Sequence, residues 1–279
     1  MTDIETLYRT SDAVGLAAHV AAGDVSPAEL LEVAIARLQA VNPLLNLLAQ
    51  DVTDRARAQA AKPLPKGPLS GVPFLVKDLG VDIAGVRTGS GSRYLDHIAD
   101  TSSHFVETAD AAGLLTFGKT TTPELGLTVT TESLATGRKV EDWNGLSGIG
   151  PISRTVRDAA AFLDVFGHPA PGDRVRPPRP EGGYLQAITR KAPRLNVALM
   201  LRPFDGGHVD ADVHAALHDS ALLIGRLGHT VREDVPAIDW AALMDANTTN
   251  IATCTARTLA AHAAAVGHEA TPESIEKIT

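Results

Sequence analysis

A lysine at the end of an apolar run is the residue whose position best suits chemistry in this sequence. The run Val72 to Val76 predicts a buried strand, and Lys77 follows it directly. Loss of water around a lysine favours the neutral amine, which can accept a proton from a hydroxyl group. Lys77 is therefore the candidate proton acceptor. The alternative interpretation is structural, with Lys77 paired to Asp78 or to a helix C-terminus at the sheet edge.

Four other side chains could act as nucleophiles, and for each a structural role is the favoured interpretation. Ser90 and Ser92 lie in a glycine-rich stretch, where serine commonly forms turns. Ser147 lies in Gly-Leu-Ser-Gly, which lacks the Gly-x-Ser-x-Gly spacing of a nucleophile elbow. Cys254 lies among threonine and alanine, as a packing residue does.

Metal and phosphate sites are not indicated. His214 and His218 are spaced to share a helix face, but no third metal ligand is obvious. The glycines of Gly85 to Gly91 match no nucleotide-binding motif, and the sequence Gly118-Lys119-Thr120 lacks the upstream glycine of a phosphate loop. We therefore expect no cofactor.

Elements that would position Lys77 are predicted on both sides of it. A helix over Ser103 to Ala112 and a buried strand over Leu114 to Phe117 complete a strand, helix, strand unit in one sheet, with parallel strands. Before it, Ser11 could cap a helix that ends near Gly23. A capping box at Ser26 begins another helix, which runs to about Asn42.

The rest of the pattern is also helical or α/β. In the helix that begins at Ser26, the apolar stripe Leu31, Ile35 and Leu38 is expected to be buried. Further helices are expected over Thr53 to Lys62 and Thr155 to Gly167, and another begins at Thr271. A proline-rich linker is expected over Pro169 to Pro180, followed by a second α/β unit made of Leu195 to Leu201, Asp210 to Leu227 and Thr230 to Val235.

Four segments, in this order, resemble the amidase signature family. They are Gly67 to Asp78 (GPLSGVPFLVKD), Gly89 to Arg93 (GSGSR), Ala112 to Glu124 (AGLLTFGKTTTPE) and Gly145 to Asp158 (GLSGIGPISRTVRD). The resemblance implies an α/β fold, a mixed β-sheet covered by α-helices. It also implies the hydrolysis of carboxylic amides by a Ser, cis-Ser, Lys mechanism, in which Lys77 has the lysine role. By the same resemblance, Leu125, Gly126, Leu127 and Thr128 lie beside the acyl pocket, although the leucines could equally be core residues.

The sequence departs from the family pattern where the two serines are expected. Their Gly-Gly-Ser-Ser-Gly-Gly loop and Gly-Gly-Ser-Ile-Arg turn should lie between Thr131-Glu132 and Gly145, but the sequence there runs directly from Gly137 into Arg138. We expect that several dozen residues are missing at this junction and that the chain also stops before the family's closing strands. Thr121 replaces a usual Asn.

These departures leave three hypotheses for function. The first is an amide hydrolase by descent that is inactive as written. The others are a non-catalytic fragment or pseudoenzyme with a retained scaffold, and a protein resembling the amidotransferase subunit that uses the same signature. We expect one truncated amidase domain over residues 1–279, with a helical part (1–62), a Lys-bearing core (63–137) and a later core with an α/β segment (138–279).

Composition limits partners and location. The formal net charge of the 279 residues is -8, so nucleic acid is an unexpected partner. No apolar stretch is long enough to span a membrane and no export signal is recognised. A single cysteine fits a reducing compartment, which predicts a cytoplasmic protein. The expected partner is a small-molecule amide substrate, if the protein is active, and a homo-oligomer is possible.

Overall fold

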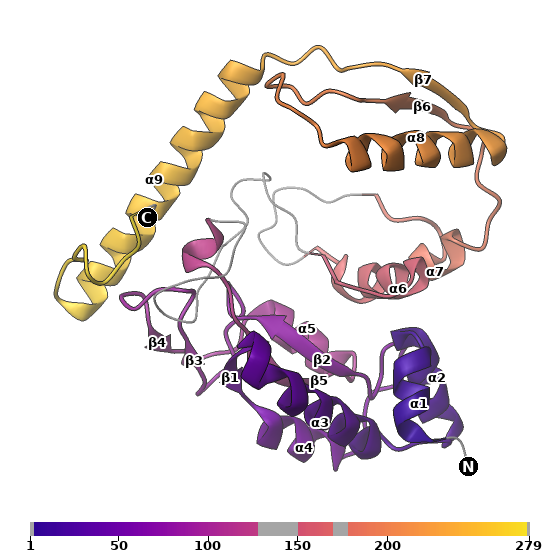
Figure 1. The fold of residues 1–279 in the computed structure, drawn as a ribbon. Coiled ribbons are helices and arrows are strands. Elements are labelled where there is room, and N and C mark those ends of the chain that lie inside the picture. The colour runs from indigo at the N-terminus through magenta and orange to yellow at the C-terminus, as the bar shows by residue number, and fades with distance from the viewer. Residues whose placement is uncertain (1–2, 128–149, 170–177, 278–279) are drawn as a thin grey trace. The chain divides into compact units, whose positions relative to one another are not determined.

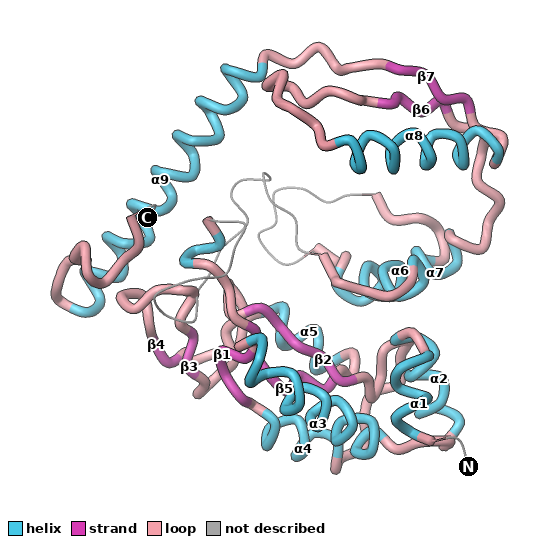
Figure 2. Tube along the Cα trace, viewed as in Figure 1, coloured by secondary structure: helices cyan, strands magenta, loops and turns pink. Residues whose placement is uncertain are grey.

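The computed structural model describes residues 3–127, 150–169 and 178–277. The chain divides into two compact units, one formed by residues 1–189 with 255–279 and the other by residues 190–254. Figures 1 and 2 show the elements of both units. Helix α9 (Trp240–Val266) contributes residues to each.

A mixed three-stranded sheet is the centre of the first unit. Its strands β1 (Leu48–Asp51), β5 (Leu115–Thr120) and β2 (Pro73–Lys77) lie in the order β1-β5-β2. Strand β2 runs parallel to β5, and β1 runs antiparallel to it. Helix α5 (His104–Ala111) connects β2 to β5, with the short strands β3 (Arg87–Thr88) and β4 (His97–Ile98) before it. The predicted parallel pair and the predicted α/β class with a mixed sheet are both confirmed.

Helices cover both faces of this sheet. On β2, Leu75 packs with buried residues of α3 (Pro27–Leu45) and α4 (Thr53–Ala60), whereas Val76 packs with Val106 of α5. Alternate residues of a strand point to opposite faces, so α3 and α4 lie on one face and α5 on the other. The other elements of this unit are α1 (Ile4–Thr10), α2 (Ala13–Ala22), the 3-10 turn η1 (Glu124–Gly126), α6 (Val156–Phe166) and α7 (Gly183–Ala187).

The local sequence explains why α3 begins and packs as it does. Ser26 accepts a hydrogen bond from the Glu29 backbone, and the Glu29 carboxylate accepts one from the Ser26 backbone, which is the predicted capping box. The predicted stripe of Leu31, Ile35 and Leu38 is buried against the sheet, with Leu115 and Phe117. A reciprocal cap and one apolar face therefore fix this helix on β5.

Two predicted helix starts are wrong. Helix α2 is capped by Asp12, whose carboxylate accepts from the Gly15 N–H, so Ser11 lies one residue too early. A carboxylate near a helix N-terminus is also favoured by the helix dipole. The segment after Thr271 forms turns instead of a helix, because Ser274 bonds back to the Thr271 carbonyl and amide.

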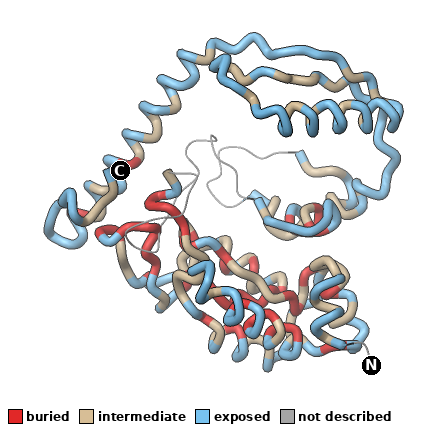
Figure 3. Tube along the Cα trace, viewed as in Figure 1, coloured by how far each residue is buried: buried red, intermediate tan, exposed pale blue. Residues whose placement is uncertain are grey.

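The second unit repeats the strand, helix, strand pattern. Strands β6 (Asn196–Leu199) and β7 (Thr230–Glu233) are parallel and are connected by α8 (Ala211–Arg226). The sequence predicted all three. No residue of 190–254 is buried, in contrast to the first unit, as Figure 3 shows. Across the described residues, no helix is both long and apolar enough to cross a bilayer.

Candidate active site

Lys77 lies at the end of its strand, as predicted, but it is not buried. Its Cα partner across the parallel ladder is Thr120, which confirms a position near the Gly118 to Pro123 turn. The predicted burial is wrong, since the Lys77 side chain is exposed, and its neighbours Val76 and Asp78 take the buried side of the strand end. Partial loss of water nevertheless lowers the pKa of the Lys77 amine below its ordinary value. That direction favours a neutral proton acceptor.

Asp78 turns into the molecule and pairs with another lysine. Its carboxylate forms an ion pair with Lys119, and neither side chain is exposed to solvent. The same carboxylate accepts hydrogen bonds through Oδ2 from the backbone N–H groups of Gly89, at 3.0 Å, and Ser90, at 3.4 Å. The structural alternative in which Asp78 pairs with Lys77 is therefore wrong.

Lys119 is the buried lysine of this site, and its sequence pattern was singled out only for a likeness to a phosphate loop. It lies in β5 and is fully buried. Its Nζ donates hydrogen bonds to Thr88 Oγ1, at 2.7 Å, and to the Arg87 carbonyl, at 3.4 Å. No local sequence signal marks Lys119, because the strand register places it: Val76 pairs with Lys119, beside the strand end that carries Asp78.

The glycine and serine loop, residues 89–93 after β3, packs on the turn after β5. The Ser90 carbonyl accepts from the Leu125 N–H at 2.9 Å, and Ser90 has a positive φ of 61°. At Gly91, with φ of 78°, an added Cβ would lie 2.4 Å from the Glu124 backbone. Only glycine permits that approach in that conformation. The stretch is therefore held tightly against Pro123 to Leu125.

The candidate nucleophiles differ in what holds them, since Ser90 is bonded through its backbone and Ser92 through its hydroxyl. Both are buried, and Ser92 Oγ accepts from the N–H groups of Tyr94, at 3.2 Å, and Leu95, at 3.3 Å. These are turn contacts, which fit the loop-forming role expected for serine here. Ser147 lies outside the described residues.

The predicted acyl-pocket residues do not share one environment. Leu125 is buried with Tyr94 and Leu95, and Leu259 and Ile275 pack against this group. Leu127 is half-buried against the same cluster, Gly126 is exposed, and Thr128 lies outside the described residues. The core alternative describes Leu125, and the acyl-pocket role of these four residues stays a prediction.

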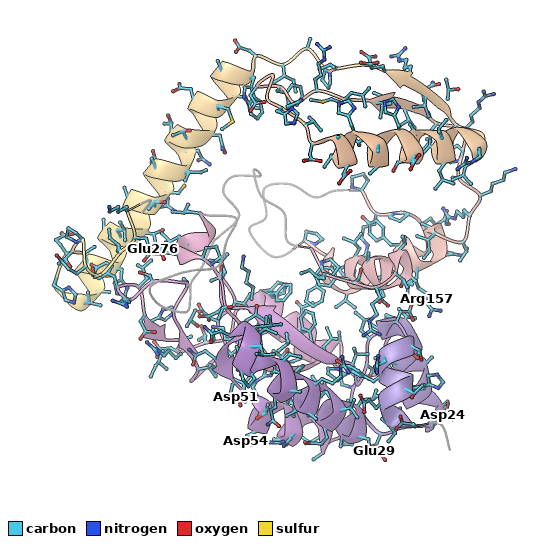
Figure 4. All side chains as sticks on the ribbon, viewed as in Figure 1. Asp24, Glu29, Asp51, Asp54, Arg157 and Glu276 are labelled. Atoms are coloured by element: carbon cyan, nitrogen blue, oxygen red, sulfur yellow. The ribbon has the colours of Figure 1, made fainter. Side chains whose placement is uncertain are left out.

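The C-terminal segment is attached to this part of the site. The backbone N–H of Glu276, which Figure 4 labels, donates to Glu124 Oε2 at 2.6 Å. Tyr94 donates through its hydroxyl to the His268 carbonyl at 2.6 Å, and its ring meets the ring of His262 edge to face. The turn after β5 is thus enclosed by residues more than a hundred positions later in the sequence.

The remaining candidate residues form no further centre. Cys254 is a half-buried thiol near Asn250, and His214 and His218 have ring centroids 6.1 Å apart on α8. Within the described part of the chain, no three His, Cys, Asp or Glu side chains could hold a metal ion. A cavity of about 230 Å³ lies near Val72 and Leu114, at the other ends of β2 and β5, and Lys77 does not line it.

Comparisons with known proteins agree on one family. The family model described as Amidase matches residues 29–145 and 140–278. The 6-aminohexanoate-cyclic-dimer hydrolase of Paenarthrobacter ureafaciens is 30% identical over 294 residues, covering 81% of this chain and 59% of the relative. The acylamidase of Rhodococcus erythropolis is 29% identical over 296 residues, covering 80% of this chain and 61% of the relative. The chain thus spans about three fifths of the length of these relatives.

Solved structures extend the likeness to the fold. The structure of 6-aminohexanoate cyclic dimer hydrolase matches with a TM-score of 0.84 and 28% identity, covering 99% of this chain and 70% of that one. A bacterial aryl acylamidase of the amidase signature enzymes matches in fold, with a TM-score of 0.74 and 20% identity, covering 90% of this chain and 66% of that one. With the Lys-bearing strand and the glycine and serine loop in the family's order, the chain belongs to the amidase signature family.

Proposed function

We propose that this protein descends from a hydrolase of carboxylic amides and that Lys77 occupies the place of its proton acceptor. The observation that carries this proposal is Lys77 itself, at the end of β2 beside Thr120, with a lowered pKa and with Asp78 engaged elsewhere. An amine whose neutral form is favoured by lost hydration is easier to use as a base. The family match to residues on both sides of Lys77 supports the same role.

For the ancestral hydrolase, the substrate class we propose is an amide with an apolar acyl group. Two relatives are named as a 6-aminohexanoate-cyclic-dimer hydrolase and an acylamidase, and both names denote amide substrates. The apolar cluster around Leu125 and Leu127 lies after β5, on the segment that follows Thr120. A cytoplasmic location, for which the single cysteine argues, belongs to the same proposal.

We further propose that the chain with this sequence does not hydrolyse amides by the family's serine mechanism. The two serine motifs are absent between Thr131 and Gly145. The alignment with the Paenarthrobacter hydrolase extends over 294 residues, more than this chain contains, although it uses only 81% of the chain. The family model also matches in two separate segments, which overlap at residues 140–145. Both features support an internal deletion near Gly137 and Arg138.

Such a deletion would remove the reacting atoms and leave the base. In the family's reaction, the serine oxygen bonds to the amide carbon, the serine proton passes through the second serine to lysine, and the C–N bond then breaks as the amine leaves with a proton. Without the serine oxygen the acyl-serine bond cannot form, so the family's route has no first step for Lys77 to assist. A non-catalytic scaffold is therefore the second candidate, and the missing serine motifs favour it.

The test is an amide hydrolysis assay on the purified chain. Its mass and the peptide from Ala135 to Trp143 are first confirmed, so that the junction Gly137-Arg138 is established. Release of acid from simple aliphatic and aromatic amides is then compared between the chain and a Lys77→Ala variant. We expect no Lys77-dependent release. Hydrolysis that the Lys77→Ala change abolishes would show that a nucleophile remains, and Ser90, Ser92 and Ser147 would be tested next.

A further inference from the structure

The buried ion pair between Asp78 and Lys119 has no part in the reaction assigned to Lys77. Asp78 directly follows β2, and Lys119 lies in the neighbouring strand β5; both side chains are fully buried. A buried ion pair costs more in lost hydration than its mutual attraction returns unless further hydrogen bonds satisfy both groups. The partners that satisfy this pair therefore indicate what it holds.

Those partners include four consecutive residues, the two of strand β3 and the two that follow it. Lys119 Nζ bonds to the Arg87 carbonyl and the Thr88 hydroxyl. Asp78 Oδ2 accepts from the next two backbone N–H groups, those of Gly89 and Ser90. The Ser90 carbonyl in turn accepts a hydrogen bond from the Leu125 N–H, after β5. One ion pair thus connects β2, β5 and the glycine and serine loop.

The pair lies on the face of β2 opposite to Lys77. Asp78 continues the ladder, since its N–H donates to the Thr120 carbonyl at 2.9 Å. Lys119 is the Cα partner of Val76, so Val76, Asp78 and Lys119 lie on one face. Successive strand residues alternate between faces, which places Lys77 on the opposite one. A one-residue slip of this strand end would exchange Lys77 and Asp78.

We propose that the Asp78–Lys119 ion pair positions Lys77, by locking the end of β2 in register with β5 and by fixing the glycine and serine loop beside it. Asp78 and Lys119 are thus positioning residues, and they act on Lys77 through the backbone. The assignment rests on the proposed function in one respect, namely that Lys77 is the residue whose position matters. The alternative is that the pair only stabilises the fold.

The experiment separates position from stability by replacing the whole pair. Buried ion pairs can often be exchanged for apolar residues with little loss of stability, so the test variant is Asp78→Leu/Lys119→Met. The matched control is Arg55→Met/Asp110→Leu, which removes a partly exposed ion pair between α4 and α5. Both are compared with the unchanged chain by denaturant unfolding, which reports stability alone.

Two readouts then report position. The first is the rate at which acetic anhydride labels Lys77 relative to exposed Lys62, followed against pH by peptide mass spectrometry. The second is amide hydrogen exchange of residues 87–92. In the test variant we expect exchange to rise about tenfold or more, as charge-assisted hydrogen bonds are lost. The pH midpoint of Lys77 labelling should rise toward the ordinary lysine range, because the strand end gains water. Arg87 keeps its ion pair with Asp96 in this variant. The control should change neither readout.

The proposal is wrong if the test variant folds and keeps the labelling midpoint of Lys77 and the exchange of 87–92 unchanged. Should that variant not fold, Thr88→Val decides, because it deletes one hydrogen bond to Lys119 and keeps the ion pair. Exchange of residues 87–92 should then rise about threefold, and no rise would overturn the proposal. Amide hydrolysis enters none of these readouts, so failure of the proposed function appears only in the assay.

Discussion

The described residues contain two strand, helix, strand motifs that have the same topology and differ in how far they are buried. The first consists of β2, α5 and β5, and residues Leu115 to Lys119 of β5 are all buried. In the second, β6, α8 and β7 have the same parallel arrangement, but no residue of 190–254 is buried. Figure 3 shows the contrast. Local sequence pattern is therefore enough to form the unit, and it does not determine burial.

The difference lies in what covers each parallel pair. Parallel sheets are normally buried on both faces. Strand β5 has β1 on one side, β2 on the other, and helices on both faces. Strands β6 and β7 have each other and α8, and large apolar side chains stay exposed in this unit at Leu195, Val213, Leu222, Leu223, Leu227 and Val235. Lys77, Asp78 and Lys119 all belong to the covered unit, which is the one able to hold a site rigidly.

The largest expected effect is the difference in lost free energy of unfolding between two matched leucine truncations. Leu115 in β5 is fully buried, whereas Leu199 in β6 is half-buried. Leu115→Ala should lower the free energy of unfolding by about 2–5 kcal/mol through lost burial and a cavity, and Leu199→Ala by about 1 kcal/mol or less. Denaturant unfolding measures both. Equal losses would mean that the second strand pair is covered in solution and would break the comparison.

Glycines at the ends of the two crossover helices give the next largest contrast. Gly113 follows α5 with φ of 78°, and Gly228 follows α8 with φ of 94°. A Cβ at Gly113 would lie 2.8 Å from Ser70 Oγ, while one at Gly228 meets nothing within 4 Å. We expect Gly228→Ala to cost about 1 kcal/mol for its left-handed backbone and Gly113→Ala about twice that. Thermal unfolding of the two variants checks the order, and the reverse order would count against tight packing after α5.

Asp12 should make the stability of the first unit depend on pH. The Arg157 guanidinium, also labelled in Figure 4, and the Thr155 hydroxyl hold the pKa of Asp12 well below its usual value. The Asp12 contribution to stability is therefore complete above about pH 4, the unfolded value, and is lost as the pH falls toward the lower folded value.

Replacing Asp12 should remove that pH dependence. We expect Asp12→Asn to lower stability by about 2 kcal/mol near pH 7 and to lower it less as the pH is brought below 4. The control is Asp234→Asn, which breaks the exposed Arg232–Asp234 pair of the second unit and should change stability by about 0.5 kcal/mol or less. Unfolding measured from pH 2 to 7 gives both results. A constant effect of Asp12→Asn over that range would contradict the assignment.

The smallest expected effect comes from the helix caps, and here the larger loss of stability is expected in the exposed second unit. Asp210 caps α8 by accepting from the Asp212 N–H at 2.9 Å, whereas Ser103 makes no capping hydrogen bond at α5. Asp210→Ala should cost about 1 kcal/mol, and Ser103→Ala should cost less, because α5 is held by burial of Val106 and Ala109. Amide exchange within each helix measures the local cost. A larger loss at Ser103 would show that α5 depends on its cap.

Elements with strong local signals could be predicted, and those that depend on distant partners could not. The capping box of α3 and the apolar runs of β2 and β5 are local, and all were predicted. Strand β1 was missed because Leu48–Asp51 is short and half-polar and exists through its antiparallel pairing with β5. Helix α9 was missed as well, since its 27 residues include no acidic residue in the first turn and few are buried.

The position of Lys77 at the end of β2 was predicted, whereas its exposure and the buried ion pair beside it were not. The apolar run fixed where Lys77 would lie, but burial at a strand end depends on which face each residue takes. A register shift between Phe74 and Leu75 brings Lys119 beside Val76, on the face that Asp78 also takes. This shift is a property of the paired strands and leaves no local signal, so the sequence indicated Lys77 as the buried lysine when Lys119 is.

The central claim, a base without its nucleophile, is tested most directly by covalent capture. An alkyl fluorophosphonate bonds through phosphorus to the oxygen of an activated serine and releases fluoride, so a single activated serine adds a fixed mass even where turnover is too slow to follow. The purified chain and its Lys77→Ala variant are incubated with the reagent and weighed intact, with a known serine hydrolase in parallel to show that the reagent is active. We predict that neither chain gains mass. An adduct on a serine of the unchanged chain that is absent from the Lys77→Ala variant would contradict the account.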